Sequence, residues 1–362
     1  MKVNSLYLVS TPRHLYQALA LAYKNLEHET AYLIVTAIKM DSPLIDIVKN
    51  DESSPFFDIL FINQGKPGSF SRVQNFSNVK QKVTTFLKPV NASRIFVGND
   101  KKPLSQWVLY QAKLINPKSI ACYVDEGIAS YFYGFSQFRK VTEWLEAKLK
   151  RVIYGSWYQM PLALGTSKYI TEALFSFPDE KQKIYESKDC KLLDAKLFKQ
   201  KSVVNLCEKI LSKSGLVKSD IEKLDAIFLM PSLNLVDSIY GGLHNLKALI
   251  NAISNKGLNI GLKYHPKDAN GSDELEEGIE NLVRIPVYLP IEMLYPLVSQ
   301  RSMIIGDVSS ALFTAKWLLP DNTLYSIASE ASIYSDTRKP LFDAVGIDIL
   351  TADSLLGVLT QV

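Results

Sequence analysis

The regular alternation of short apolar runs with longer amphipathic stretches limits the folds open to this chain more than any other feature. The runs in the first half are Leu6–Val9, Ala31–Val35, Ile59–Ile62, Arg94–Val97 and Ile120–Val124. Helix-like stretches, such as Leu15–Asn25 and Leu104–Ile115, lie between them. Apolar strands that alternate with helices predict a parallel sheet covered on both faces.

The second half repeats this pattern. Its expected strands are Ala226–Met230, Ile260–Tyr264, Val283–Ile285, Met303–Ile305 and Leu324–Ile327. Its expected helices are Leu243–Ser254, Ile291–Val298 and Ser310–Leu318. We therefore expect an α/β fold with two doubly wound, Rossmann-like domains that face a central cleft.

The length of 362 residues fits two such domains. A charged, Lys-rich segment between Ser187 and Lys223 contains the expected boundary. We assign residues 1–190 to an N-terminal domain and residues 191–362 to a C-terminal domain. The last helix is a candidate to pack back on the N-terminal domain.

Composition excludes several other classes of protein. Hydrophobic residues make up 47% and charged residues 22%, as in a soluble globular protein, and the net charge of +4 is too mild to indicate nucleic-acid binding. Three cysteines without CxxC spacing and four histidines without zinc-ligand spacing predict neither a disulfide framework nor a metal site. No signal peptide or membrane-spanning run is expected, and a cytoplasmic location follows.

Two adjacent carboxylates, Asp125 and Glu126, follow the expected strand that ends at Val124. Gly127 comes next and permits a tight turn or a close approach of the backbone. The carboxyl end of a parallel strand faces the ligand crevice of a doubly wound sheet. A carboxylate at this place can take a proton from a sugar hydroxyl.

A histidine follows the expected strand Ile260–Tyr264 in the same way. Pro266 restricts the backbone of His265 to extended conformations. The imidazole can then donate a hydrogen bond to a phosphate oxygen or act as a general acid. Lys263 and Lys267 add positive potential.

Two further features of the second half indicate a nucleotide site. Ser309 and Ser310 lie between an expected strand and a helix, where hydroxyls, backbone N–H groups and the helix dipole bind phosphate. Glu292 begins another helix-like stretch, where it either interacts with the helix dipole or accepts hydrogen bonds from both hydroxyls of a ribose.

The loop after the first expected strand, Ser10–His14, also points to the crevice. Arg13 and His14 are candidates to bind a ligand there. Asn99 and Asp100, after the strand Arg94–Val97, are weaker candidates of the same kind.

These motifs resemble those of the bacterial sialyltransferases of the GT-B type, a group that includes polysialyltransferases. The group carries a D/E-D/E-G motif, an HP motif and a Ser/Thr pair. Here they read Asp125-Glu126-Gly127, His265-Pro266 and Ser309-Ser310, in the group's order. The stretch from Ile285 to Phe313 also resembles the group's donor-site region, and the resemblance covers the C-terminal domain best.

The resemblance implies a GT-B-like enzyme that moves sialic acid, or a related nonulosonic acid, from a CMP-sugar to an oligosaccharide acceptor. The acceptor would belong to a surface glycan such as capsule or lipooligosaccharide. Transfer would invert the anomeric carbon and need no metal or other cofactor, which agrees with the absence of a DxD motif.

The resemblance also implies roles for single residues. One carboxylate of the Asp125-Glu126 pair would be the base; Asp125 is favoured, with Glu126 as the rival. His265 would assist departure of the CMP phosphate, which the Ser309-Ser310 pair would bind. Glu292 would hold the ribose hydroxyls.

Three alternatives stay open. The donor could be CMP-Kdo, or CMP-activated pseudaminic or legionaminic acid. The chain could be a non-catalytic nucleotide-sugar-binding or regulatory protein of the same fold, or a GT-B enzyme that uses a UDP-sugar.

A basic and apolar stretch, Phe138–Arg151, concerns location. Such an amphipathic helix can lie on an anionic membrane, here the cytoplasmic face of the inner membrane. The alternative is a domain helix that packs on the sheet.

Overall fold

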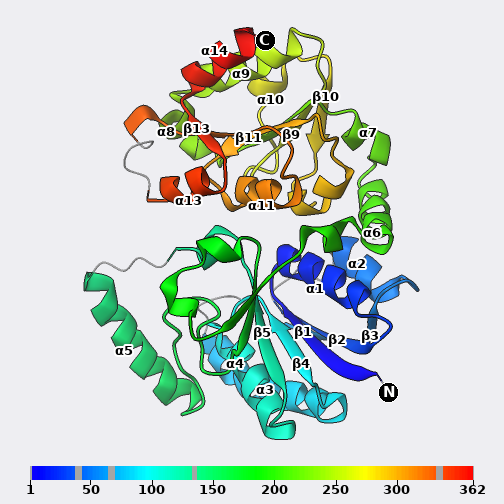
Figure 1. Ribbon diagram of the computed structural model, residues 1–362, viewed down its shortest axis with the longest axis vertical. Helices are drawn as coiled ribbons and strands as arrows, with labels where there is room; N and C mark the ends of the chain where they lie inside the picture. Colours follow the sequence, from blue (N-terminus) through cyan, green and yellow to red (C-terminus); the bar gives the residue numbers. More distant parts are fainter. Residues whose placement is uncertain (1, 37–42, 64–69, 133–136, 332–336, 362) are drawn as a thin grey trace. The chain divides into compact units, whose positions relative to one another are not determined.

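Two compact units make up the chain, Met1–Val203 and Val204–Val362 (Figure 1). The computed structural model describes residues 2–36, 43–63, 70–132, 137–331 and 337–361. The first unit extends beyond the expected end at residue 190 because β7 (Asp189–Leu192) pairs with β6 (Glu172–Phe175). A division after residue 190 would cut through β7.

The first unit contains a seven-stranded parallel sheet in the order β3-β2-β1-β4-β5-β6-β7. Its other strands are β1 (Val3–Val9), β2 (Glu29–Thr36), β3 (Phe56–Ile62), β4 (Arg94–Val97) and β5 (Ile120–Val124). Its helices are α1 (Pro12–Lys24), α2 (Pro43–Asn50), α3 (Phe70–Val90), α4 (Pro103–Ile115) and α5 (Gln137–Tyr154). The strand order reverses between β1 and β4, and ligands of doubly wound sheets bind at such a switch point.

Local sequence explains why β1 and α1 form where they do. Leu6 and Leu8 are buried on the central strand, and Tyr7 stacks on Phe96 of β4 with 4.8 Å between ring centroids. Thr11 is the N-cap of α1: its hydroxyl accepts a 3.2 Å hydrogen bond from the backbone N–H of His14. This cap fixes the first turn of α1 directly after β1.

The second unit contains a six-stranded parallel sheet in the order β10-β9-β8-β11-β12-β13. Its strands are β8 (Ala226–Leu229), β9 (Ile260–Lys263), β10 (Leu282–Ile285), β11 (Met303–Asp307), β12 (Leu324–Ile327) and β13 (Asp348–Leu350). Its helices are α7 (Lys218–Glu222), α8 (Val236–Tyr240), α9 (Leu243–Ser254), α10 (Asp273–Glu276), α11 (Ser310–Leu318), α13 (Lys339–Ala344) and α14 (Ala352–Gln361), while α6 (Lys201–Ser212) spans the division between the units. The switch point of this sheet lies between β8 and β11.

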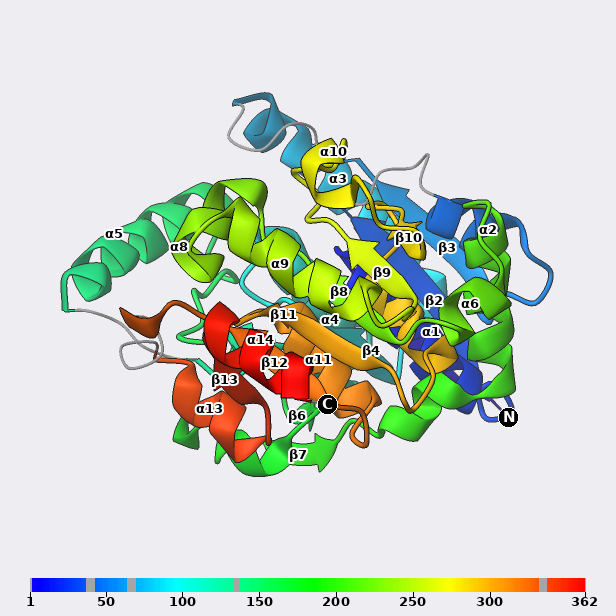
Figure 2. The ribbon, with the colours of Figure 1, turned by 90° about the horizontal axis from the view of Figure 1, so that it is seen from above.

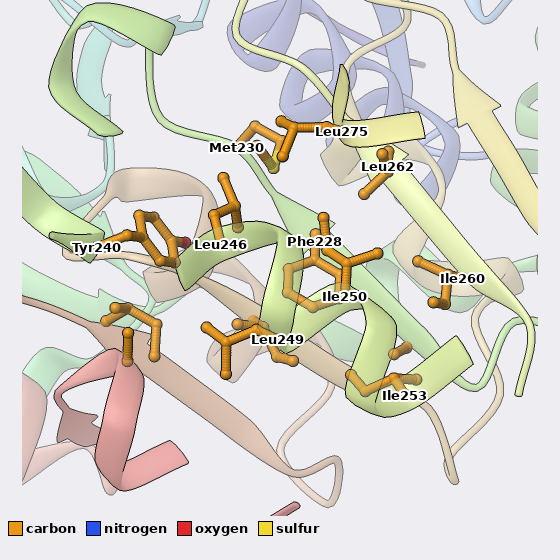
Figure 3. Packing of buried hydrophobic residues seen from close by; sticks show 14 of the residues in the cluster. Phe228, Met230, Tyr240, Leu246, Leu249, Ile250, Ile253, Ile260, Leu262 and Leu275 are labelled. Atoms are coloured by element: carbon orange, nitrogen blue, oxygen red, sulfur yellow. The ribbon is translucent and has the colours of Figure 1, made fainter. Parts of the chain in front are cut away.

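Helix α9 covers one face of the second sheet. Its apolar side chains are fully buried against strand residues such as Phe228 and Leu262 (Figure 3). The helix contributes Leu246, Leu249, Ile250 and Ile253. Burial of one such side chain contributes about 1.5–3 kcal/mol to folding.

The last helix packs within its own unit. α14 lies beside α9 over the same face of the sheet (Figure 2). Leu355 and Leu359 join the core around α9. This contact accounts for the apolar face of α14.

The structure corrects one expected helix. Residues 291–298 form two 3-10 turns, η6 (Ile291–Met293) and η7 (Tyr295–Leu297), in place of one α-helix. Pro296 is the reason, because proline lacks the N–H of the helical ladder and its ring clashes with the preceding turn. Among the described residues, no helix is long and apolar enough to cross a membrane.

Candidate active site

Three strands of the first unit end at one edge of the sheet, next to its switch point. Ser10 and Thr11 follow β1, Gly98 and Asn99 follow β4, and the Asp125-Glu126 pair follows β5. Arg13 and His14 approach the same edge from the first turn of α1. The structure therefore brings Arg13, His14, Asn99 and the Asp125-Glu126 pair together.

Asp125 is a buried, fully hydrogen-bonded carboxylate. Its side chain has no exposed surface. Oδ1 accepts hydrogen bonds from the backbone N–H of Gly127 and from Oγ of Ser130, the latter at 3.1 Å. Oδ2 accepts from Oη of Tyr131 at 2.5 Å and from the backbone N–H of Ser176 at 3.0 Å. These four donors occupy the carboxylate and hold the turn after β5.

The environment of Asp125 keeps the hydroxyl of Tyr131 protonated, so that it can donate a hydrogen bond to the carboxylate. Burial and the nearby Asp125 charge raise the pKa of Tyr131 well above its ordinary value, so the phenol keeps its proton. Nη2 of Arg13 lies 3.9 Å from Oδ1 of Asp125. This guanidinium compensates the buried negative charge.

Glu126 has a different environment. Its side chain is 21% exposed, and Nε2 of His14 lies 3.3 Å from its Oε1. Nδ2 of Asn99 donates a 3.1 Å hydrogen bond to Oε2. The carboxylate is thus oriented by two side chains and still open to a substrate, as a general base requires.

A short chain of polar contacts fixes His14. Nζ of Lys102 donates to Oγ of Ser10 at 2.9 Å, and this hydroxyl lies 3.3 Å from Nδ1 of His14. Donation from Ser10 to Nδ1 places the proton of a neutral imidazole on Nε2, which faces Glu126. His14 is almost fully buried, so its orientation is set by these contacts.

Two glycines make room for the side chains of His14 and Arg13. A Cβ at Gly98 would lie 2.3 Å from Nε2 of His14. A Cβ at Gly127 would lie 2.6 Å from Nη1 of Arg13, and Gly127 also has a φ of +84°. Sequence reasoning missed Gly98; a glycine directly after a strand at the switch point is the signal that could have found it.

Asp100, a weaker candidate, does not belong to the site. Its carboxylate is buried and accepts hydrogen bonds from the backbone N–H groups of Gly165 and Ser167 at 2.7 and 2.8 Å. Burial raises its pKa. Asp100 therefore holds a loop, whereas its neighbour Asn99 contacts Glu126.

In the second unit, Lys263 and His265 lie at the end of β9. Lys263 is buried, and its Nζ donates a 2.6 Å hydrogen bond to the carbonyl of Pro286. Burial lowers the pKa of Lys263 to about 8, although nearby Glu292 opposes this shift. Nδ1 of His265 accepts a 3.2 Å hydrogen bond from the backbone N–H of Lys267, so Nε2 carries the proton of the neutral ring.

The turn from β11 to α11 contains the serine pair. Ser309 is the N-cap of α11, and its Oγ accepts a 3.5 Å hydrogen bond from the backbone N–H of Leu312. Ser310 is exposed at the first helical position, and Glu292 is partly exposed in η6. Hydroxyls at the positive end of a helix dipole can bind a phosphate.

Two residues of this region were not found from the sequence. Asp307 ends β11, and burial raises its pKa, against the effects of Ser309, Arg338 and His265. Nη1 of Arg338 donates a 2.6 Å hydrogen bond to the carbonyl of Val308. No motif marks Arg338, because only the chain fold brings it next to the β11–α11 turn.

The candidate residues form two sets, one in each unit. The first set contains Arg13, His14, Asp125, Glu126 and Gly127, and the second contains Lys263, His265, Pro266, Glu292, Ser309 and Ser310. The first set follows β1 and β5; in the second set, Lys263, His265 and Pro266 lie at the end of β9, the serine pair follows β11, and Glu292 lies in η6. Over the part of the chain that the structure describes, no group of three histidine, cysteine or acidic side chains is placed to hold a metal ion.

The chain is similar to proteins of known family and structure. A family model described as alpha-2,8-polysialyltransferase (POLYST) matches residues 5–328. No protein of curated function matches by sequence. A sialyltransferase from Photobacterium damsela is similar in structure, with a TM-score of 0.59, 13% identity, and coverage of 97% of this chain and 82% of that one.

Two more solved structures are similar. The GT-B domain of a Photobacterium damselae sialyltransferase has a TM-score of 0.56 and 12% identity, with coverage of 97% of this chain and 100% of that one. The UDP-GlcNAc 2-epimerase from Methanocaldococcus jannaschii has a TM-score of 0.57 and 13% identity, with coverage of 100% and 92%. The expected GT-B-like fold of two Rossmann-like units is confirmed.

Proposed function

Since the chain belongs to the alpha-2,8-polysialyltransferase family, it is a glycosyltransferase that takes a nucleotide-sugar donor and a glycan acceptor, and we propose that its donor is a CMP-activated nonulosonic acid. Sialic acid is the first candidate. The reaction is an inverting, metal-independent transfer to a hydroxyl of a surface oligosaccharide. The main support for this proposal is the carboxylate of Glu126, which is accessible to a substrate and is held by His14 and Asn99.

Glu126 is the base of the proposed reaction. It takes the proton of the acceptor hydroxyl while the hydroxyl oxygen attacks the anomeric carbon, and the bond from that carbon to the phosphate oxygen of CMP breaks. His14 and Asn99 hold the carboxylate in one orientation. Asp125 acts as a positioning residue, because its four hydrogen bonds maintain the turn that presents Glu126.

The second unit binds the donor in this proposal. Nε2 of His265 donates to the departing phosphate, and Ser309, Ser310 and the N-terminus of α11 bind its oxygens. Glu292 accepts hydrogen bonds from the ribose hydroxyls, and Lys263 adds positive charge beside it. CMP leaves with a single phosphate, whose charge these groups can stabilise without Mg²⁺.

Release of CMP, measured with several CMP-sugars and a panel of acceptors, tests the donor and the acceptor together. We expect turnover with CMP-sialic acid that persists in EDTA. Preference for CMP-Kdo or for CMP-activated pseudaminic or legionaminic acid would change only the sugar. Loss of activity in EDTA, restored by Mg²⁺, would contradict the metal-free mechanism.

Ligand binding separates the remaining alternatives. We expect CMP and CDP, but not UDP, to raise the melting temperature. Stabilisation by UDP alone would favour a UDP-sugar enzyme. Binding of a CMP-sugar without turnover on any acceptor would favour a non-catalytic binding protein.

We also propose that α5 contacts an anionic membrane surface, so that the enzyme works at the cytoplasmic face of the inner membrane. Leu145, Leu149 and Val152 are 55%, 60% and 83% exposed and recur at helical spacing. Lys148 and Arg151 are exposed beside them. Exposed apolar and basic side chains on one helix suit acyl chains and acidic headgroups. The side chains of residues 138–144, the first part of the expected amphipathic stretch, lie outside the described residues.

A further inference from the structure

Arg338 lies at the turn that carries the serine pair. Its Nη1 donates a 2.6 Å hydrogen bond to the carbonyl of Val308, the residue directly before the N-cap Ser309. The side chain is partly buried. The residue follows the end of the family match at 328, so the resemblance gives it no role.

A rigid support holds Arg338 in this place. Its carbonyl accepts hydrogen bonds from the backbone N–H groups of Leu341 and Phe342 in the first turn of α13, both at 3.1 Å. Phe342 is fully buried and lies against Phe313 of α11, with 6.1 Å between ring centroids. The helix that follows Arg338 is therefore packed on the helix that follows the serine pair.

The charges around this turn have a consistent arrangement. Burial raises the pKa of Asp307, and the nearby side chains of Arg338 and His265 oppose this shift. His265 follows β9 and Asp307 ends β11, which are the two neighbours of β8 in the sheet. Arg338 therefore adds a permanent positive charge to the place where the proposed function puts the phosphate.

We propose that Arg338 binds the phosphate of the nucleoside monophosphate, together with the serine pair at the N-terminus of α11. A guanidinium has five N–H donors in one plane, so it can hold the Val308 carbonyl and a phosphate oxygen at once. The phosphate has one negative charge in the donor and gains a second when CMP departs. A fixed cation stabilises this added charge more than it stabilises the donor.

This inference rests on the proposed CMP-sugar donor. The test compares CMP with cytidine, which lacks the phosphate, as ligands of the wild-type enzyme and of Arg338→Gln in calorimetric titrations. We expect the affinity for CMP to fall at least about tenfold and the affinity for cytidine to stay the same, because charge-assisted hydrogen bonds to phosphate are strong. Arg338→Lys, which keeps the charge, should recover part of the loss.

Lys339→Gln is the matched control. It removes one positive charge from the neighbouring residue, whose Nζ forms an exposed ion pair with Asp343 at 2.6 Å. We expect this variant to bind CMP as the wild type does. A similar loss of CMP affinity in Lys339→Gln would assign the effect to general charge and overturn the proposal.

The remaining outcomes are decisive as well. If Arg338→Gln lost affinity for CMP and cytidine equally, Arg338 would be structural. If it kept the wild-type preference for CMP over cytidine, only this inference would fail. If the wild type bound UDP but neither CMP nor cytidine, the proposed donor itself would be wrong. If Arg338→Gln does not fold, Arg338→Lys is titrated in its place: a weaker affinity for CMP with an unchanged affinity for cytidine would support the proposal, and an unchanged affinity for CMP would overturn it.

Discussion

Nε2 of His14 lies 3.3 Å from Oε1 of Glu126, although the two residues come from elements far apart in the sequence. His14 belongs to the first turn of α1, and Glu126 follows β5. β4 lies between β1 and β5 in the sheet, and Gly98, which directly follows β4, has no side chain that would occupy the space of the imidazole. This contact orients the carboxylate that we propose as the base.

Substitution of the two adjacent carboxylates should have different consequences. Glu126→Gln keeps the size of the side chain, and the position is partly exposed, so that water can satisfy the new amide group; we expect a change in unfolding free energy below about 1 kcal/mol. Loss of the base should lower kcat by a factor of about 10²–10⁴. Chemical denaturation and CMP release measure the two quantities.

Asp125→Asn provides the contrast. An amide N–H₂ would face donors such as the backbone N–H of Ser176, so we expect a loss of about 3 kcal/mol in stability together with lower activity. If Asp125→Asn were stable but inactive while Glu126→Gln stayed active, Asp125 would be the base and Glu126 would not.

Gly98→Ala should displace His14. The new Cβ would lie within 2.7 Å of three atoms of the imidazole, so the ring must move away from Glu126. We expect kcat to fall about tenfold to a hundredfold, with little change in the KM for the donor, because the second unit binds the donor. Steady-state kinetics with the donor as the varied substrate measures both.

Gly357→Ala is the matched control for this change. Gly357 lies in α14, and a Cβ there would have no heavy atom within 4 Å. Its kinetics should equal those of the wild type. A Gly98→Ala enzyme with wild-type kcat would show that the position of His14 does not matter for transfer.

The buried Lys263 predicts a pH dependence of donor binding. Its pKa is lowered to about 8 by burial, so the ammonium loses its proton as the pH rises through this value. We expect the KM for the donor to rise above about pH 8. Lys263→Arg should remove this rise, because a guanidinium stays charged at such pH values. A wild-type KM that is constant from pH 7 to 9.5 would argue against a role of the Lys263 charge.

The same shift has a consequence for stability. The ordinary pKa of 10.5 applies to the unfolded chain, so between about pH 8 and 10.5 the unfolded state binds more protons than the folded state. Burial of the charged ammonium of Lys263 therefore destabilises the folded state fully below pH 8. This destabilisation decreases as the pH rises from about 8 to 10.5. Lys263→Met should stabilise the protein most below pH 8, as thermal melts at several pH values would measure.

The exposed face of α5 predicts binding to acidic lipids. The double variant Leu149→Glu, Val152→Glu places charge on two exposed apolar positions. We expect binding to vesicles with anionic lipid to fall at least about tenfold, and binding to zwitterionic vesicles to be weak for all forms. Phe57→Glu, at a residue of β3 that is 76% exposed, is the control and should bind as the wild type. If wild-type protein formed dimers that the double variant could not form, and ignored vesicles, the face would be an interface between copies.

Much of the fold was predictable because it depends on local patterns. The ten expected strands all coincide with observed strands, since buried parallel strands need continuous apolar runs. Three short strands were missed, namely β6 and β7 at one end of the first sheet and β13 at the edge of the second. β7 and β13 contain no buried residue and lack that pattern. The helix expected over 291–298 was wrong because Pro296 interrupts the ladder.

The sequence by itself determined which residues lie at strand ends, and so placed Asp125, Glu126 and His265 among the candidates. Only the tertiary structure separated the two carboxylates, because burial and hydrogen bonding depend on residues distant in the chain: Ser176 donates to Asp125, while His14 and Asn99 hold Glu126. The same reason explains why Arg338 could not be found from a motif. A local pattern sets the direction of the backbone, but the solvation and partners of a charge are set by the folded chain around it.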